Sequence, residues 1–143
     1  MQTSLGNSTK SNEIVESIKI PLINQEFLFI CGVKNMKSLR KHFDKDMHKL
    51  VNEVFDGYDD VKIYTDAYVE YYQTEEGNYY LSLVIRKIDD NILKTLVHEI
   101  VHIMQHIRRI FFLNKVEVEF EAYLTEWIFE QVCEILKSNQ LIK

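Results

Sequence analysis

The stretch Thr95–Gln105, TLVHEIVHIMQ, contains the pattern His98-Glu99-x-x-His102. Residues four positions apart share one face of an α-helix, so the two imidazole rings can each offer a nitrogen to one metal ion. Glu99 follows the first histidine directly and leans over the edge of that face, where it can accept a proton from a water molecule that the metal activates. The pattern therefore predicts a helix that carries two metal ligands and a general base.

The residues around this pattern predict how the helix is oriented. Asp89 and Asp90 are candidates for its N-cap, and the helical pattern runs to about Phe112. Its apolar positions form one stripe, made of Leu93, Leu96, Ile100, Ile103, Met104 and Ile107. The opposite side of the helical wheel carries His98, His102, Gln105 and Arg109. The metal-binding face is thus the polar face, and it can look into a cleft while the stripe is anchored in the core.

Composition and charge narrow the class of protein. Of the 143 residues, 46% are hydrophobic and 27% charged, as in an ordinary globular protein with one core. A formal net charge of −5 argues against a general nucleic-acid binder. No apolar run approaches the ~20 residues that span a bilayer, and the polar start of the chain lacks the apolar stretch of a secretory signal. We therefore expect a cytoplasmic protein that binds neither nucleic acid nor membranes.

The chain is expected to form one domain. Residues 1–12 are rich in Ser, Asn and Thr and are predicted to be a flexible tail, which leaves residues 13–143 for a single folded unit. The two cysteines, Cys31 and Cys133, are too few for a disulfide framework and do not form a CxxC pair. We expect both to be reduced, buried thiols.

The first half of the chain predicts one long helix and several strands. Glu13–Ile20 reads as a short helix or as a strand, whereas Phe27–Cys31 reads as a buried strand. Asn35 is the N-cap of a helical pattern that Gly57 closes, with His42 and His48 expected as solvated side chains on it.

Two tyrosine-rich segments predict a β-hairpin. Val61–Gln73 and Tyr79–Lys87 are strand-like, and Gly77 and Asn78 lie in the turn between them. Because no basic residues interleave with the tyrosines, we interpret these as half-buried sheet residues rather than as a stacking surface for nucleic-acid bases.

A second helix follows the first after a short connection, so the two are predicted to pack as antiparallel neighbours. Asn114 and Glu117 form a variant of the capping box at its start. The helix is apolar almost all round, which implies extensive burial, and yet it carries Glu117, Glu119, Glu121, Glu126 and Glu130. A buried carboxylate needs a partner, and a metal ion is one such partner.

A catalytic zinc usually has three protein ligands, so a third donor is required. His106 continues the series of histidines, but at 1.5 Å of rise per residue it lies about 12 Å from His98 along the helix axis, too far to share an ion. The second helix is the better source. On its wheel Glu119 lies with Tyr123, Glu126 and Glu130, whereas Glu117 and Glu121 lie on another side, and periodicity alone leaves both groups open.

The motif and the segment Glu119-Phe120-Glu121-Ala122-Tyr123 together resemble the glutamate-zincins, the thermolysin-like clan of metallopeptidases. In these proteins the third ligand lies in a Glu-x-x-Ala/Ser-Asp/Asn/Tyr segment on the next helix. The layout is most similar to the minimal zinc-peptidase-like proteins of phages and bacteria. The resemblance implies His98, His102 and Glu119 as zinc ligands, with Glu121 as the alternative third ligand.

The same resemblance implies a fold and a function. The fold would be α+β and zincin-like, with an N-terminal helix, a small and mostly antiparallel sheet with a β-hairpin, the HExxH helix and an antiparallel C-terminal helix. The activity would be zinc-dependent hydrolysis of peptide bonds with Glu99 as general base, acting on a peptide or protein that pairs with an edge strand of the hairpin. The alternative is a catalytically weak or inactive protein of the same fold that binds a host or phage protein. No oligomeric state is predicted.

Overall fold

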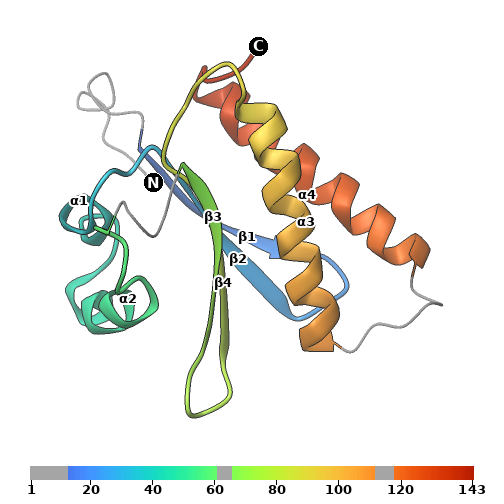
Figure 1. Cartoon of the computed structure of the whole chain (residues 1–143). Helices are drawn as coiled ribbons and strands as arrows, with labels where there is room; N and C mark the ends of the chain where they lie inside the picture. Colours follow the sequence, from blue (N-terminus) through green and yellow to red (C-terminus); the bar gives the residue numbers. More distant parts are fainter. Residues whose placement is uncertain (1–12, 61–65, 112–117) are drawn as a thin grey trace.

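A four-stranded sheet lies between two layers of helices. The structure is a computed structural model that describes residues 13–60, 66–111 and 118–143. Along the chain the elements are β1 (Ile14–Ile20), β2 (Gln25–Cys31), α1 (Met36–Arg40), the 3-10 helix η2 (Lys45–Met47), α2 (His48–Val54), β3 (Ala67–Gln73), β4 (Tyr79–Ile85), α3 (Ile92–Phe111) and α4 (Val118–Ser138). Figure 1 shows α3 and α4 on one side of the sheet and α1 and α2 on the other.

The strand order is β1-β2-β4-β3, in which β2 and β4 are parallel and the two outer pairs are antiparallel. The α+β class and the mostly antiparallel sheet are therefore confirmed. The helix expected at the N-terminal end of the domain instead follows two strands. The ambiguous segment Glu13–Ile20 forms β1, and its buried residues Ile14, Ile18 and Ile20 point to one face because strand residues alternate.

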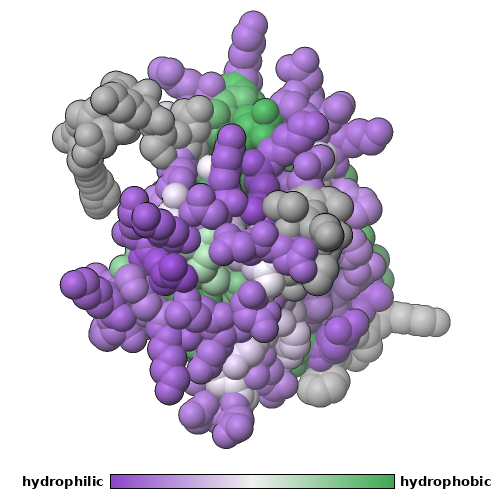
Figure 2. Space-filling view, turned by 60° about the vertical axis from the view of Figure 1, so that its left-hand side comes forward, coloured by the Kyte–Doolittle hydropathy of each residue, from purple (hydrophilic) through white to green (hydrophobic). Residues whose placement is uncertain are grey.

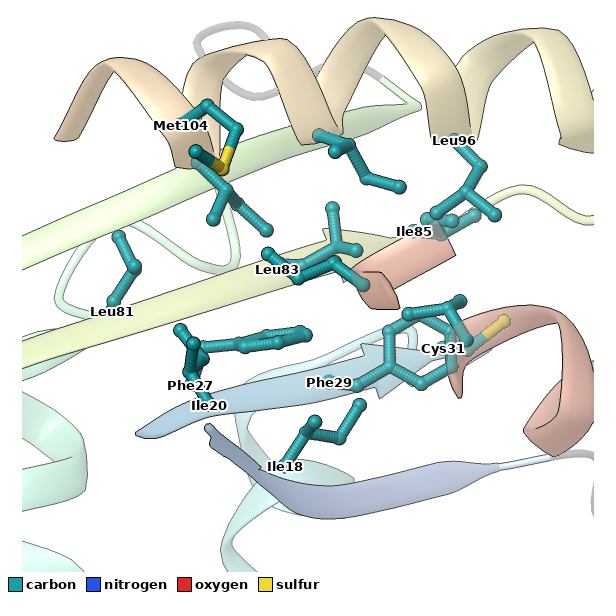
Figure 3. Packing of buried hydrophobic residues seen from close by; sticks show 14 of the residues in the cluster. Ile18, Ile20, Phe27, Phe29, Cys31, Leu81, Leu83, Ile85, Leu96 and Met104 are labelled. Atoms are coloured by element: carbon teal, nitrogen blue, oxygen red, sulfur yellow. The ribbon is translucent and has the colours of Figure 1, made fainter. Parts of the chain in front are cut away.

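The larger core fills the space between the sheet and the two long helices. Alternate residues of β2 and β4, including Phe27, Phe29, Leu81 and Leu83, point toward α3 and meet Leu96 and Met104 there (Figure 3). From α4 this core receives Leu124, Ile128, Val132 and Leu136, which are spaced by four residues. Burial of each large apolar side chain contributes roughly 1.5–3 kcal/mol, so this core anchors the helix that carries the HExxH motif.

A smaller core joins the other face of the sheet to α1 and α2, and the helical layer there is broken. We predicted one continuous helix from Asn35 to Gly57, and this is wrong, because residues 41–47 leave the α-helical path. His48 Nε2 lies 2.9 Å from the carbonyl oxygen of Arg40 and 3.1 Å from that of Phe43. The imidazole of His48, which we expected in solvent, thus lies against two carbonyls at and after the end of α1, of which that of Arg40 also accepts a hydrogen bond from the Phe43 N–H.

The start of α1 follows the sequence pattern more closely. Asn35 is the N-cap, and its side-chain oxygen accepts a hydrogen bond from the Ser38 N–H at 2.8 Å. His42 is exposed as predicted, with Nε2 2.8 Å from a carboxylate oxygen of Glu13.

The hairpin is confirmed for the residues that the structure describes. β3 and β4 pair from Ala67 opposite Ile85 to Gln73 opposite Tyr79. Gly77 has a φ of 91° in the turn, a conformation that favours glycine. The tyrosines of β3 and β4 are half-buried, as predicted: Tyr68, Tyr71, Tyr72, Tyr79 and Tyr80.

The remaining predictions concern the cysteines, membrane-spanning helices and segments outside the described residues. Cys31 is buried, which raises the pKa of its thiol to about 12, and Cys133 is half-buried; both are unpaired. Within residues 13–60, 66–111 and 118–143, no helix has both the length and the apolar character needed to cross a bilayer. The predicted tail, the start of the first hairpin segment and the capping box of Asn114 and Glu117 lie outside the described residues.

Candidate metal centre

The two histidines of the motif converge on one point. Both lie on the solvent side of α3, opposite the buried Leu96, Ile100, Ile103 and Ile107. The Nε2 atom of His98 lies 3.3 Å from the Nε2 atom of His102, and the ring centroids are 4.9 Å apart. The orientation predicted from the helical wheel is therefore correct for both histidines.

This separation fits two ligands of one metal ion. Two imidazole nitrogens bound at about 2.0–2.1 Å to a tetrahedral zinc ion lie about 3.3–3.4 Å from each other. A second observation concerns His102, whose Nδ1 lies 2.9 Å from the side-chain oxygen of Gln105. When Nδ1–H donates to that oxygen, Nε2 keeps its lone pair free, which is the tautomer that a metal ligand needs. The histidine pair therefore has the nitrogen separation of two ligands of one zinc ion, and the contact with Gln105 suits the tautomer that His102 needs as a ligand.

The side chain of Glu99 is more deeply buried than the sequence implied. Only 6% of its surface is exposed, although it adjoins both histidines. Burial raises the pKa of its carboxyl group, and positive charge on His98 or His102 acts in the opposite direction. A carboxyl group with a raised pKa is a stronger base than a solvated glutamate.

The third ligand is not in place among the described residues. Within these ranges no three His, Cys, Asp or Glu side chains form a group that could hold a metal ion. Glu119 lies on the exposed side of α4 together with Tyr123, Glu126 and Glu130. The structure thus brings His98 and His102 together without Glu119. The burial predicted for the glutamates of this helix is wrong for Glu119, Glu126 and Glu130, which are exposed, whereas the side chain of Glu121 is mostly buried.

Glu121 faces α3 and already has a partner. Its two carboxylate oxygens accept hydrogen bonds from Arg108 at 2.7 and 2.8 Å. These bonds lower the pKa of the Glu121 carboxyl. In this arrangement Glu121 ties α4 to α3 and is engaged by a cation rather than available to a metal ion.

His106 is held between α3 and the edge of the sheet. Its ring stacks on Tyr71 of β3, with centroids 5.0 Å apart and an angle of 5° between the planes. Its Nδ1 atom is buried and has no hydrogen-bond partner among the described residues. Burial is the main cause of a lowered pKa, with Arg109 and His102 acting in the same direction. His106 is therefore a neutral contact to the edge strand and not a third ligand.

The outer surface of α3 is more apolar than the sequence pattern implied. Leu93, which we placed in the buried stripe, is 42% exposed, while Ile92 is buried in its place. Val97 and Val101 follow Leu93 at four-residue steps and are about half exposed. These three residues form an apolar ridge beside the histidine pair.

Two contacts that shape the site were missed from the sequence. The stacking of Tyr71 on His106 joins residues far apart in the chain, and no local pattern predicts it. The pairing of Arg108 with Glu121 joins two helices whose relative rotation the sequence does not define. The contact of Gln105 with the His102 ring could have been predicted, because Gln105 stands three residues after His102 on the same polar face. Comparisons with protein-family models, with curated proteins and with solved structures find no match.

Proposed function

We propose that this chain is a zinc-dependent, metallopeptidase-like protein. The observation that carries the proposal is the convergence of the His98 and His102 Nε2 atoms at 3.3 Å, with Gln105 bound to Nδ1 of His102. Hydrogen-bonded pairs of imidazoles also occur without a metal, but the HExxH spacing and the buried acid next to the pair favour a hydrolytic centre.

In this proposal His98, His102 and Glu119 hold the metal. Zinc, when bound, acts as a Lewis acid that polarises the scissile carbonyl and lowers the pKa of water. The carboxylate of Glu99 accepts a proton from the attacking water and later donates it to the nitrogen of the leaving amine. Its burial supports this role, because burial raises the pKa of the carboxyl and so makes it a stronger base than a solvated glutamate.

The edge strand β3 supports a peptide as substrate. β3 lies at one end of the strand order, so one of its two edges has no partner among the strands that the structure describes. Its residue Tyr71 packs on His106, one helical turn beyond His102. An extended peptide that added to β3 would run along the helix that carries the histidines.

The alternative function, a protein of this type that binds a partner without cleaving it, has a specific observation in its favour. The apolar ridge of Leu93, Val97 and Val101 is exposed beside the histidine pair, and Glu119 is not gathered to it. Exposed apolar side chains in a row are typical of contact surfaces.

Zinc content and peptide cleavage, measured together, test the proposal. Protein purified without a histidine tag should hold one zinc ion, and His98→Ala should lose it, whereas the exposed His42→Ala should keep it. Gln105→Ala should bind zinc about 10-fold more weakly in competition with a chromogenic chelator, because it loses the bond that orients His102. Absence of zinc from the wild-type protein, even after zinc is added, would contradict the proposal.

Three glutamate variants separate the roles of the carboxylates. Glu99→Gln should retain zinc and lose chelator-sensitive cleavage of an unfolded protein substrate, and Glu126→Gln is its control on the exposed side of α4. Glu119→Ala should lose zinc; retention there together with loss in Glu121→Ala would move the third ligand. Zinc binding without cleavage by the wild-type protein favours the partner-binding alternative.

We also propose that the protein works in the cytoplasm. The two cysteines are unpaired thiols, one of them buried, which is the state that a reducing compartment maintains.

A further inference from the structure

A cavity lies on the side of the sheet that faces away from the histidine pair. It has a volume of about 190 Å³ and lies between the α2 layer and strands β2 and β4. Its apolar walls include Leu28, Phe43, Met47, Leu50, Val51 and Val54. Figure 2 brings this side of the molecule forward and shows a small apolar area within a mostly hydrophilic surface. Since an apolar cavity of about 150 Å³ accommodates benzene, the space fits an apolar body of about six carbon atoms.

A hydroxyl group at the wall of this cavity has no partner. Ser82 lies in the middle of β4 with 2% of its surface exposed, and it lines the cavity. No residue in the described part of the chain hydrogen-bonds to its hydroxyl. Its oxygen is not one of the fully enclosed polar atoms without a partner, so the hydroxyl opens to the cavity, where a ligand or water can bind it.

A carboxyl group without a cation stands next to that hydroxyl. Glu70 of β3 is the register partner of Ser82, so the two side chains project from the same face of the sheet. Side chains directly opposite in an antiparallel pair have Cβ atoms about 4.5–5.5 Å apart. Among the described residues, none makes a hydrogen bond or an ion pair with Glu70. Burial, and then the charge of Asp56, raise the pKa of its carboxyl to about 7, as expected for an acid that lacks a counter-charge.

The charged residue in the cavity lining is Glu26, whose register partner on β1 is Lys19, whereas the charges named around Glu70, outside that lining, are acidic. The lining itself contains no lysine or arginine. At the end of α2, Asp56 acts on Glu70, and Glu53 accepts a hydrogen bond of 3.4 Å from the hydroxyl of Tyr72, the next residue of β3 on this face. A cation is therefore the charge that the part of this surface beside Glu70 complements.

We propose that the cavity binds a small free primary amine, with its apolar body against Leu50 and Val54 and its ammonium group between the Ser82 hydroxyl and the Glu70 carboxylate. The apolar volume sets the size of the ligand, and the acid with its neighbouring hydroxyl sets the charge. This site uses no residue of the histidine centre and does not depend on zinc.

Methyl NMR of the full chain tests the proposal with three probes of equal length. At pH 8 hexylamine should shift the methyl signals of Leu28, Leu50 and Val54 in a saturable manner, with those of Leu96 and Leu124 as internal controls on the other face. Hexanol should bind about 10-fold more weakly, and hexanoate more weakly still. Unsaturable shifts up to the solubility limit, or equal affinities for the three probes, would overturn the proposal.

Variants locate the ammonium and the apolar body. Glu70→Gln should lower the affinity for hexylamine to that for hexanol, and Glu75→Gln in the hairpin turn should leave both unchanged. Val54→Phe should abolish binding of both probes by filling the cavity. If Val54→Phe does not fold, Glu70→Gln alone decides: an unchanged preference for hexylamine in that variant refutes the role of Glu70. Tighter binding of Nα-acetyl-lysine methylamide than of hexylamine would overturn the proposal of a free amine. It would indicate that the cavity binds the lysine side chain of a peptide.

Discussion

Helices cover the two faces of the sheet to different extents, and this difference decides what kind of site each face can hold. On one face α3 and α4, each about 20 residues long, bury a continuous core and carry most of their charged side chains outside it. On the other face α1 and α2 have 5 and 7 residues, and they leave a cavity with a buried hydroxyl at its wall. The long helices hold side chains at fixed positions outside the core, as a metal site requires, while the short helices leave space within it.

The largest expected difference between the faces is in the free energy of unfolding that is lost when a leucine is replaced by alanine. Leu96→Ala, under α3, should lower the free energy of unfolding by about 3 kcal/mol, because the dense core there cannot close the resulting void. Leu50→Ala, beside the existing cavity, should cost about 1 kcal/mol, since its side chain is only half-buried. Urea denaturation monitored by circular dichroism measures both. Equal losses would show that the two faces are packed alike.

A smaller expected effect is the contribution of Glu70 to the pH dependence of the free energy of unfolding. Its carboxyl binds a proton more tightly in the folded chain than in the unfolded one, so this residue lowers stability as pH rises from about 4.5 to about 7. Glu70→Gln removes this dependence. The variant should be more stable than the wild type by about 1 kcal/mol at pH 8, a value that allows for the partial exposure of the group. At pH 4 the difference should vanish, and a constant difference from pH 4 to 8 would exclude a titrating Glu70 as its cause.

The smallest effect concerns His106 on the opposite face. His106→Phe keeps a ring against Tyr71 and removes the buried nitrogen that lacks a partner, so it should stabilise the chain by about 0.5 kcal/mol at pH 8. Because burial lowers the pKa of His106, the unfolded chain binds the extra proton below about pH 6.5, and the gain should grow as pH falls. Thermal unfolding at pH 8 and pH 5.5 measures it, with Tyr71→Ala as the variant that removes the stack. A gain that is larger at pH 8 than at pH 5.5 would contradict this account.

The face with the long helices was predicted better than the other, for a physical reason. α3 has an amphipathic repeat sustained over five turns, and its stripe from Leu96 to Ile107 is buried as expected. The hairpin was predicted as well, because Gly77 and alternating strand residues define it locally. In contrast, the break between α1 and α2 depends on His48 binding carbonyls of the preceding segment, a contact that apolar periodicity does not report.

The same distinction applies to the candidate metal site. The positions of His98 and His102 follow from helix geometry, so their convergence was predictable from spacing alone. The burial of Glu99 and the stack of His106 on Tyr71 depend on where the sheet edge meets α3. The rotation of α4, which turns Glu121 toward Arg108 and Glu119 toward solvent, depends on packing between two helices that are both largely apolar. Nothing in a wheel of either helix defines that rotation.

The parallel pairing of β2 with β4 has a consequence for how the chain folds. Residues 27–31 pair with residues 81–85, and both α1–α2 and β3 lie between them in the sequence. Closing a loop of about 50 residues is entropically costly, whereas the β1–β2 and β3–β4 hairpins each close over a few residues. We expect the two hairpins and the α3–α4 pair to form early and the β2–β4 contact to limit the rate of folding. The cavity is lined by residues of both β2 and β4, so it does not exist until the slowest step is complete, whereas the His98–His102 pair depends on α3 alone and can form before it.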